Sequence, residues 1–104
     1  MMHQRQIDLA ERADGTFDFS SYFSHIKDRI QSADIAIANM EFTLAGEPYS
    51  GYPTFCAPDS FLYAIKNAGF NVLLFANNHC LDRGRKGVLH TLGMLDSLGF
   101  KHCG

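Results

Sequence analysis

The chain has 104 residues, of which 46% are apolar and 19% charged, and its formal net charge is −2. This ordinary composition excludes a disordered, fibrous or membrane-embedded chain and indicates a single domain over residues 1–104. Lysine and arginine form no stripe along the sequence, so the charge pattern gives no indication of nucleic acid or anionic lipid as a partner.

The sequence contains no membrane-targeting signal. No apolar run approaches the roughly 20 residues that span a bilayer, and the polar start MMHQRQIDLAERAD lacks the apolar core of a signal peptide. As written, the sequence predicts a cytoplasmic protein. A segment upstream of Met1 would change this prediction to a membrane-anchored or extracytoplasmic protein, and membrane association is expected only through such a segment.

The first predicted elements are a helix and a strand. A helix over residues 18–32 is predicted because its apolar residues follow helical spacing: Phe19, Tyr22, Phe23, Ile26 and Ile30. The apolar run that begins at Asp34 and ends at Ala38 predicts a strand buried on both faces of a parallel sheet. Asn39 and Glu41 follow directly at the C-terminal end of this strand.

Residues 42–57 are predicted to form an irregular surface loop. Glycines and prolines interrupt the segment and its apolar residues lose their periodicity. Loops of this length often carry function. The aromatic residues Tyr49, Tyr52 and Phe55 have two interpretations: they border the mouth of a site, or they cover the core beneath the loop.

Two more helices and one more strand complete the pattern. Pro58 suits the first position of a helix that ends at Gly69, and a third helix is predicted to end at Gly99. The apolar residues of these helices are Phe61, Leu62, Ile65 and Ala68 in the first, and Val88, Leu89, Leu92 and Leu95 in the second. The segment 71–76 repeats the buried-strand pattern. This βαβα order predicts an α/β fold with right-handed crossovers and a parallel sheet covered by helices.

Polar residues follow both predicted strands. Ligands of parallel α/β sheets collect beyond the carboxyl ends of the strands, which selects the segments 39–41 and 77–82. Glu41 offers a hard oxygen ligand, Asn78 a carbonyl oxygen, and His79 an imidazole that can bind a metal or donate a proton. These residue types are typical of a metal site.

Each of these residues also has a purely structural interpretation. Asn77 and Asn78 suit a turn after a strand, because asparagine tolerates left-handed backbone and bonds to its own main chain. Glu41 fits a solvated loop, and Asp82 fits an N-cap or turn. His79 taken alone fits a surface or capping histidine.

A basic cluster lies beside this segment. Arg83, Arg85 and Lys86 are close together in the sequence. They form either a solvated turn or, next to a metal site, a group of cations that attracts an anionic substrate.

The three cysteines, Cys56, Cys80 and Cys103, are odd in number and lack a C-x-x-C pair. This spacing argues against a disulfide framework and a zinc knuckle, so the cysteines are interpreted as packing residues. Cys80 follows His79 directly, which leaves a Cys–His nucleophile as the weaker alternative because adjacent residues seldom point at one another.

Several segments, in order, resemble the bacterial capsule-synthesis protein CapA family, which is implicated in poly-gamma-glutamate synthesis. The matching segments are 34–41, 52–58 and 68–79, followed by Leu-Asp-x-Gly at 81–84. The resemblance covers almost the whole chain, and Asn-Asn-His followed by Leu-Asp-x-Gly is its most specific part. The family is similar to the calcineurin-like metallophosphoesterases, whose two-metal sites lie on a layered α/β/β/α sandwich. The resemblance therefore implies a partial sandwich of this kind.

The resemblance also implies roles for individual residues. Asn78 would be a metal ligand, Glu41 an acidic ligand that bridges metals, and His79 the catalytic group that stabilises or protonates a reacting phosphate. The implied cofactors are divalent ions of Mn, Fe or Zn, two in the complete protein. The implied substrate is an anion that contains phosphate or carboxylate. The residues expected to contact it are Asn39, Asn77, Asp82 and Arg83.

The sequence also departs from the family pattern. Family members open with a strand ending in Gly-Asp, whose aspartate is the expected first metal ligand, and this strand is absent before Met1. The chain is therefore interpreted as truncated, with further histidine ligands and a second sheet expected beyond Gly104. His3 has two interpretations, a borrowed metal ligand or a disordered terminal residue.

Two functional hypotheses follow. In the first, the complete protein is a metal-dependent phosphoesterase-type hydrolase of capsule biosynthesis, and this chain alone has low or no activity. In the second, the chain is a catalytically silent fragment or interaction domain that keeps the fold without a complete metal site. A missing edge strand would expose unpaired backbone, so a homo-oligomer through this sheet edge is a further expectation.

Overall fold

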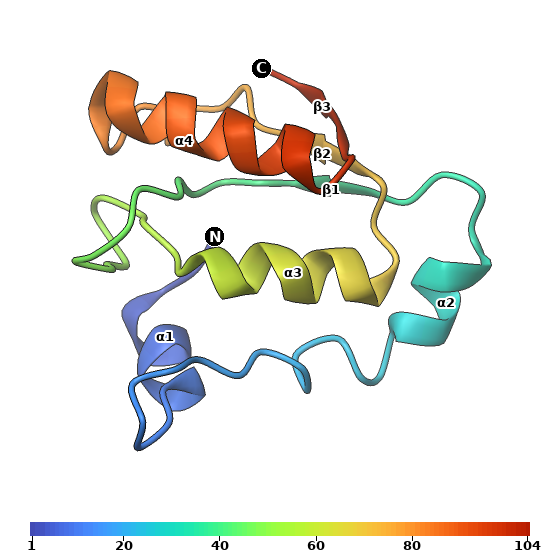
Figure 1. The fold of residues 1–104 in the computed structure, drawn as a ribbon. Helices are drawn as coiled ribbons and strands as arrows, with labels where there is room; N and C mark the ends of the chain where they lie inside the picture. Colours follow the sequence, from blue (N-terminus) through green and yellow to red (C-terminus); the bar gives the residue numbers. More distant parts are fainter.

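Three short parallel strands form one sheet in the computed structural model, which describes residues 1–104 (Figure 1). The strands are β1 (Ile37–Asn39), β2 (Val72–Leu74) and β3 (Lys101–Cys103), and they lie in the order β1-β2-β3. Ala38 pairs with Leu73, and Leu73 pairs with His102. The predicted α/β fold with a parallel βαβα core is confirmed.

Helix α3 (Asp59–Ala68) connects β1 to β2, and helix α4 (Gly84–Ser97) connects β2 to β3. Because parallel crossovers are right-handed, this sequential strand order places both helices on the same face of the sheet. Figure 1 shows the two helices running in the same direction beside the sheet. The structure therefore shows one sheet with both crossover helices on one face, and the expected α/β/β/α sandwich with a second sheet stays a prediction.

The strands are not buried on both faces, so that part of the prediction is wrong. Ile37 and Leu74 are 56% and 41% exposed, whereas Leu73 is fully buried. Successive side chains of a strand point to opposite faces of the sheet, and both crossover helices cover the face that carries Leu73. The opposite face carries apolar side chains and has no layer over it.

Helix α3 agrees with the sequence pattern. Phe61, Leu62, Ile65 and Ala68 are buried. Pro58 is the N-cap rather than the first helical residue. Gly69 ends the helix in the left-handed conformation, with φ of 108°, and a Cβ there would lie 2.8 Å from the side chain of Gln31. Glycine meets both requirements because it has no Cβ.

Helix α4 begins at Gly84, before the predicted apolar stripe. Its buried residues are Gly87, Thr91 and Leu95, whereas Leu89 is 58% exposed. The placement of Leu89 in the buried stripe was therefore wrong. The buried face follows a spacing of four residues and uses a glycine and a threonine, which a search for large apolar side chains overlooks.

The predicted helix over residues 18–32 is largely absent. Only α2 (Lys27–Ser32) is α-helical, and residues 20–26 form successive turns. The carboxylate of Asp18 accepts a hydrogen bond from the backbone N–H of Ser20 at 3.0 Å, and such local bonds compete with helix formation. Phe19 is nevertheless buried, whereas Ile26 is 49% exposed. The apolar spacing therefore indicated that Phe19, Tyr22 and Phe23 pack into or against the core, although they are not helical.

Helix α1 (Gln4–Ala10) was not predicted. The backbone N–H of His3 donates a hydrogen bond to Oε1 of Gln6 at 2.9 Å, and Ile7 and Ala10 are buried at a helical spacing. Met2 is fully buried as well. The start of the chain is therefore held by packing, so the interpretation of His3 as a disordered end does not apply.

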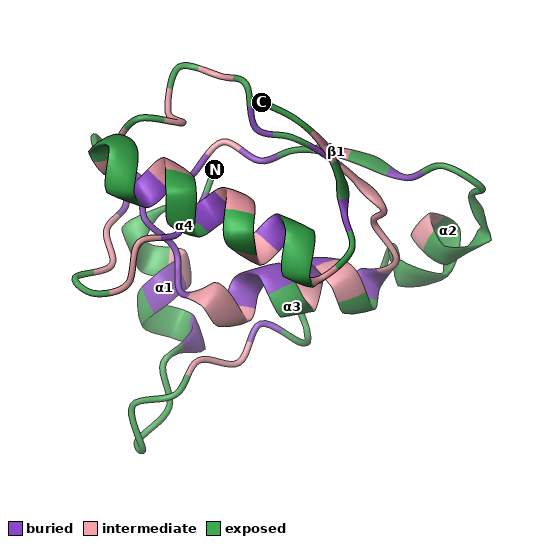
Figure 2. Cartoon of the chain, turned by 45° about the horizontal axis from the view of Figure 1, so that its top comes forward, coloured by how far each residue is buried: buried purple, intermediate pink, exposed green.

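The hydrophobic core lies between the covered face of the sheet, the helices and the segments on either side of α3. Figure 2 shows buried residues along α3 and α4, whereas α2 is mainly exposed. The predicted loop over residues 42–57 is irregular, but its two ends are buried: Phe42, Thr43, Leu44, Phe55, Cys56 and Ala57. The prediction of a surface loop is therefore wrong at both ends. No helix has the length and apolar character needed to cross a membrane.

Candidate functional site

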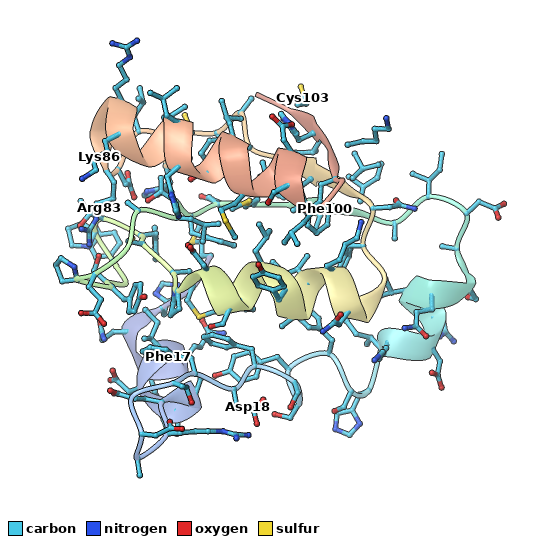
Figure 3. All side chains as sticks on the ribbon, viewed as in Figure 1. Phe17, Asp18, Arg83, Lys86, Phe100 and Cys103 are labelled. Carbon is cyan, nitrogen blue, oxygen red and sulfur yellow. The ribbon has the colours of Figure 1, made fainter.

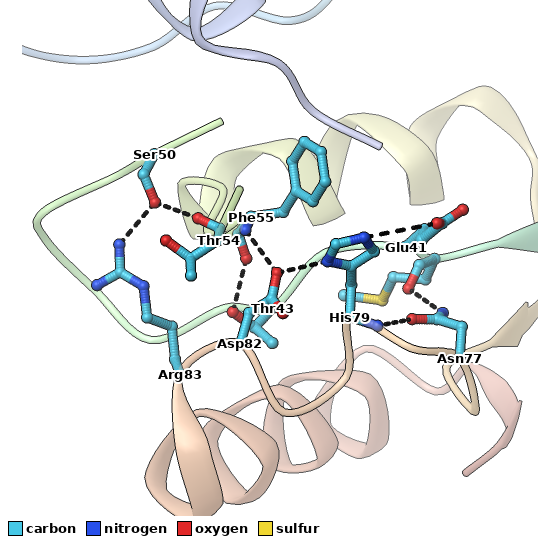
Figure 4. Close-up of polar contacts among 10 residues, drawn as sticks. Glu41, Thr43, Ser50, Thr54, Phe55, Asn77, His79, Asp82 and Arg83 are labelled. Atoms are coloured by element: carbon cyan, nitrogen blue, oxygen red, sulfur yellow. Dashed lines mark hydrogen bonds and ion pairs between the residues drawn. The ribbon is translucent and has the colours of Figure 1, made fainter. Parts of the chain in front are cut away.

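The two candidate segments meet at the carboxyl edge of the sheet. Glu41 follows β1, His79 follows β2, and Glu41 Oε1 lies 3.9 Å from His79 Nε2 (Figure 4). The side chains of Glu41, His79 and Asp82 are 18%, 16% and 12% exposed. They are therefore largely removed from water, with part of each side chain still exposed.

Asp82 holds the imidazole of His79 through one ring nitrogen. Its Oδ2 lies 2.7 Å from Nδ1 of His79. An ionised carboxylate can only accept hydrogen bonds, so this contact requires the proton of the imidazole to be on Nδ1. The other ring nitrogen, Nε2, is left facing Glu41.

The space between Nε2 and Glu41 has a clear electrostatic preference. The distance of 3.9 Å is too long for a direct hydrogen bond. A neutral ring with its proton on Nδ1 presents a lone pair to the Glu41 carboxylate. A proton on Nε2, or a cation between Nε2 and Oε1, converts this contact into an attraction. The site is therefore suited to a proton donor or to a bound cation.

Two asparagines connect the ends of the strands. Asn77 donates from Nδ2 to Asn39 Oδ1 at 3.2 Å and to the carbonyl oxygen of Met40 at 3.0 Å, and its Oδ1 accepts the N–H of His79 at 3.0 Å. Asn39 donates from Nδ2 to Glu41 Oε2 at 3.1 Å. These amides hold Glu41 and the turn that begins at Asn77 in place. The interpretation of Asn77 as a turn residue agrees with these contacts. Asn78 is exposed at the same edge.

Arg83 contacts the loop over residues 42–57. Its Nη2 donates to the carbonyl oxygen of Pro48 at 2.6 Å and to Oγ of Ser50 at 2.8 Å. Arg85 and Lys86 are exposed, and Figure 3 shows Arg83 and Lys86 near the start of α4. Within the basic cluster, Arg83 thus anchors the loop, and the two exposed cations are the ones available to an anion.

The aromatic residues of the loop have different roles. Phe55 is 1% exposed and its ring centroid lies 4.7 Å from that of His79, whereas Tyr52 is 78% exposed. Tyr49 packs edge-on against Phe17 at 5.3 Å, and burial together with the charge of Glu47 raises the pKa of Tyr49. The interpretation that the loop borders a site therefore holds for Phe55. The interpretation that it covers the core holds for Tyr49.

The cysteines are all free. Cys56 is buried, and its Sγ donates to the carbonyl oxygen of Gly46 at 3.5 Å. Cys80 is partly buried and packs against the core, as the packing interpretation predicts. Cys103 is exposed, so that interpretation is wrong for it, because β3 is an edge strand and Cys103 lies on the uncovered face of the sheet.

The chain's own residues fit a metal only in part. Metal bonds of about 2.0–2.2 Å to nitrogen and oxygen allow one ion to contact both His79 Nε2 and Glu41 Oε1 across their 3.9 Å separation. No group of three or more His, Cys, Asp or Glu side chains is placed to hold an ion. His3 packs its ring against Phe55, with centroids 5.2 Å apart. By themselves, these residues therefore supply too few ligands to hold a metal ion.

The fold and these side chains define a parallel α/β domain with a His–Asp pair that faces a carboxylate at the carboxyl edge of the sheet. The sequence profile of the family described as bacterial capsule synthesis protein PGA_cap matches residues 1–104. The chain belongs to this family. The resemblance to CapA proteins is thereby confirmed.

Curated relatives support this assignment. Two uncharacterized proteins of Sinorhizobium fredii, y4sH and y4uA, are each 31% identical over 90 residues, which is 79% of this chain and 20% of the relative. The capsule biosynthesis protein CapA of Bacillus anthracis is 32% identical over 76 residues, which is 67% of this chain and 18% of the relative. The chain matches about a fifth of the length of these relatives.

Proposed function

We propose that this chain carries the acid–base part of a metal-dependent, phosphoesterase-type hydrolytic site in a capsule-synthesis protein. One observation carries the proposal: His79 is oriented by Asp82 through Nδ1 and faces Glu41 with Nε2 at 3.9 Å. A histidine held by a carboxylate on one nitrogen, with the other nitrogen open to a ligand, is a common arrangement of general acids and bases.

Each residue has a proposed role in this chemistry. His79 donates a proton from Nε2 to an oxygen of the substrate, and Asp82 holds the imidazole and stabilises its charged form. Glu41 and the exposed Asn78 would contribute ligands to metal ions, which would supply an activated water and stabilise charge on phosphoryl oxygens. Arg85 and Lys86 attract a substrate that carries phosphate or carboxylate groups.

The number of ligands limits what the chain does alone. Glu41 and Asn78 supply fewer ligands than two metal ions require, and no acidic or histidine cluster adds to them. We propose that ligands from outside these 104 residues complete the site, so that the isolated chain binds metal weakly and has little activity. The same observation supports the second candidate function, a catalytically silent domain that keeps the fold.

Paramagnetic broadening by Mn²⁺ in nuclear magnetic resonance spectra separates the two candidates, because it detects weak binding. We expect Mn²⁺ to broaden the signals of Glu41, Asn78 and His79 first, and Glu41→Gln to remove this effect. The matched control is the exposed pair of Asp59 and His90, whose carboxylate and Nε2 are 3.0 Å apart. Asp59→Asn should leave the broadening at Glu41 unchanged.

Thermal melts and hydrolysis of a generic phosphodiester complete this experiment. Stabilisation by a ligand follows RT ln(1 + [L]/Kd), so a weak site gives almost no shift, whereas a complete site at about 100 Kd gives roughly 2.7 kcal/mol. We expect neither a melting shift nor hydrolysis for the isolated chain. Hydrolysis that His79→Ala abolishes would show that the site is complete. Absence of broadening near Glu41 would favour the silent domain.

A further inference from the structure

Phe55 contacts both members of the His–Asp pair. We propose that Phe55 is a positioning residue for His79, which fixes the direction of Nε2 through its ring and the place of Asp82 through its backbone. This inference rests on the proposed function only in taking His79 as the acting group. The contacts from which it is argued involve only residues of this chain (Figure 4).

The ring of Phe55 packs directly on the imidazole. The two ring centroids are 4.7 Å apart and the ring planes are 81° from parallel. Asp82 holds the imidazole at one atom, Nδ1, so the ring retains freedom to tilt about that contact. An edge-to-face contact with a buried aromatic ring removes this freedom and keeps Nε2 aimed toward Glu41.

The backbone of Phe55 acts on the same pair. Its N–H donates to Asp82 Oδ2 at 2.7 Å, and this oxygen also contacts His79 Nδ1 at 2.7 Å. Two donors on one oxygen fix the carboxylate more firmly than the histidine alone, because hydrogen bonds to a charged acceptor are the stronger kind. Phe55 therefore holds Asp82 in place, and Asp82 in turn holds His79.

Phe55 is itself held rigidly. Its carbonyl oxygen accepts hydrogen bonds from the N–H of Thr43 at 3.1 Å and from Oγ1 of Thr43 at 2.9 Å, and Thr43 is fully buried. The ring is 1% exposed, and the ring of His3 packs against it edge-on. A contact residue fixed on several sides can transmit its position to a neighbour, as a supporting shell around a site requires.

The alternative is that Phe55 only fills the core, as other buried phenylalanines do. Phe42 provides the matched comparison, because it is 3% exposed and its ring packs against Phe61 at 5.3 Å. Phe55→Leu keeps an apolar side chain and the backbone N–H but removes the ring, and Phe42→Leu makes the same change in the core. A purely packing role predicts similar effects of both substitutions on His79.

The experiment is nuclear magnetic resonance of the His79 side chain in the metal-free protein at one fixed pH. We expect cross-relaxation between the ring protons of Phe55 and His79 in the unaltered protein. We also expect Phe55→Leu to broaden the signals of the carbon-bound ring protons of His79, because the imidazole then moves between orientations, and Phe55→Tyr, which restores a ring, to sharpen them. Phe42→Leu should leave these signals in place.

Two results would overturn the inference. One is the absence of cross-relaxation between the Phe55 and His79 rings in the unaltered protein, which needs no variant and is independent of any folding defect. The other is an equal change of the His79 signals in Phe55→Leu and Phe42→Leu. Because no metal or substrate is added, failure here is distinct from failure of the proposed function, which the Mn²⁺ experiment detects.

Discussion

At the scale of single residues, Asp82 connects separate parts of the candidate site. One of its oxygen atoms, Oδ2, contacts both Nδ1 of His79 and the N–H of Phe55. The side chain is 12% exposed, so water replaces these contacts poorly. Asp82 therefore contributes to the stability of this edge as well as to the orientation of His79.

This position gives a stability prediction for Asp82→Ala. The substitution leaves a backbone N–H and an imidazole N–H without their acceptor, which should lower the free energy of unfolding by about 1–3 kcal/mol. Urea unfolding followed by circular dichroism measures the change.

Asp96→Ala is the matched control for this measurement. Asp96 also pairs with a histidine, His102, at 3.0 Å, but its side chain is 73% exposed. An exposed pair contributes about 0–1 kcal/mol, so this variant should change stability little. Equal losses in the two variants would contradict a special role for Asp82 at the site.

At the scale of elements, α4 is attached to the segment after β1 by one buried hydroxyl group. Oγ1 of Thr91 accepts the N–H of Leu44 at 2.9 Å and lies 2.7 Å from the carbonyl oxygen of Gly87. Thr91 is fully buried. Glu41 lies in the segment after β1, and His79 lies in the loop before α4. This bond therefore helps to set the distance between Glu41 and His79.

Thr91→Val tests this attachment. Valine keeps the branched shape but leaves the N–H of Leu44 buried without an acceptor, which should cost about 1–3 kcal/mol of unfolding free energy. Ser97→Ala serves as the control, since Ser97 is exposed and bonds only within its helix, to Met94. An exposed substitution of this kind changes stability by within about 0.5 kcal/mol. A loss no larger in Thr91→Val than in the control would show that the bond is dispensable.

At the scale of the whole molecule, the uncovered face of the sheet is the main apolar surface without a packing layer. Ile37 and Leu74 on this face are 56% and 41% exposed. Exposed apolar side chains on an uncovered sheet favour association, and the unpaired edge strands add backbone groups that a neighbour can bond.

We therefore expect the isolated chain to self-associate as its concentration rises. Ile37→Lys should weaken the association, because it places a charge within the apolar face. Leu89→Lys, at an exposed apolar residue of α4, is the control and should leave the association unchanged. Sedimentation velocity measures the effect. A chain that remains monomeric throughout the concentration series, or equal effects of both variants, would show that this face does not mediate association.

The sequence by itself determined the features that depend on local pattern. Apolar patterns located β1, β2, α3 and most of α4, and the strand ends located Glu41 and the segment from Asn77 to Asp82. Parallel strands carry their carboxyl ends to one edge, so the meeting of Glu41 and His79 followed from the order of elements alone. The family was also evident from short motifs in the sequence.

The contacts between side chains at that edge came from the tertiary structure. The bond from Phe55 to Asp82 joins residues 27 apart in sequence, that from Asn77 to Asn39 joins residues 38 apart, and that from Leu44 to Thr91 joins residues 47 apart. The bare face of the sheet likewise depends on which side both crossover helices occupy. Periodicity reports only how a segment divides its side chains between core and solvent. Contacts between distant segments form when packing brings their backbones together, and no local pattern contains that information.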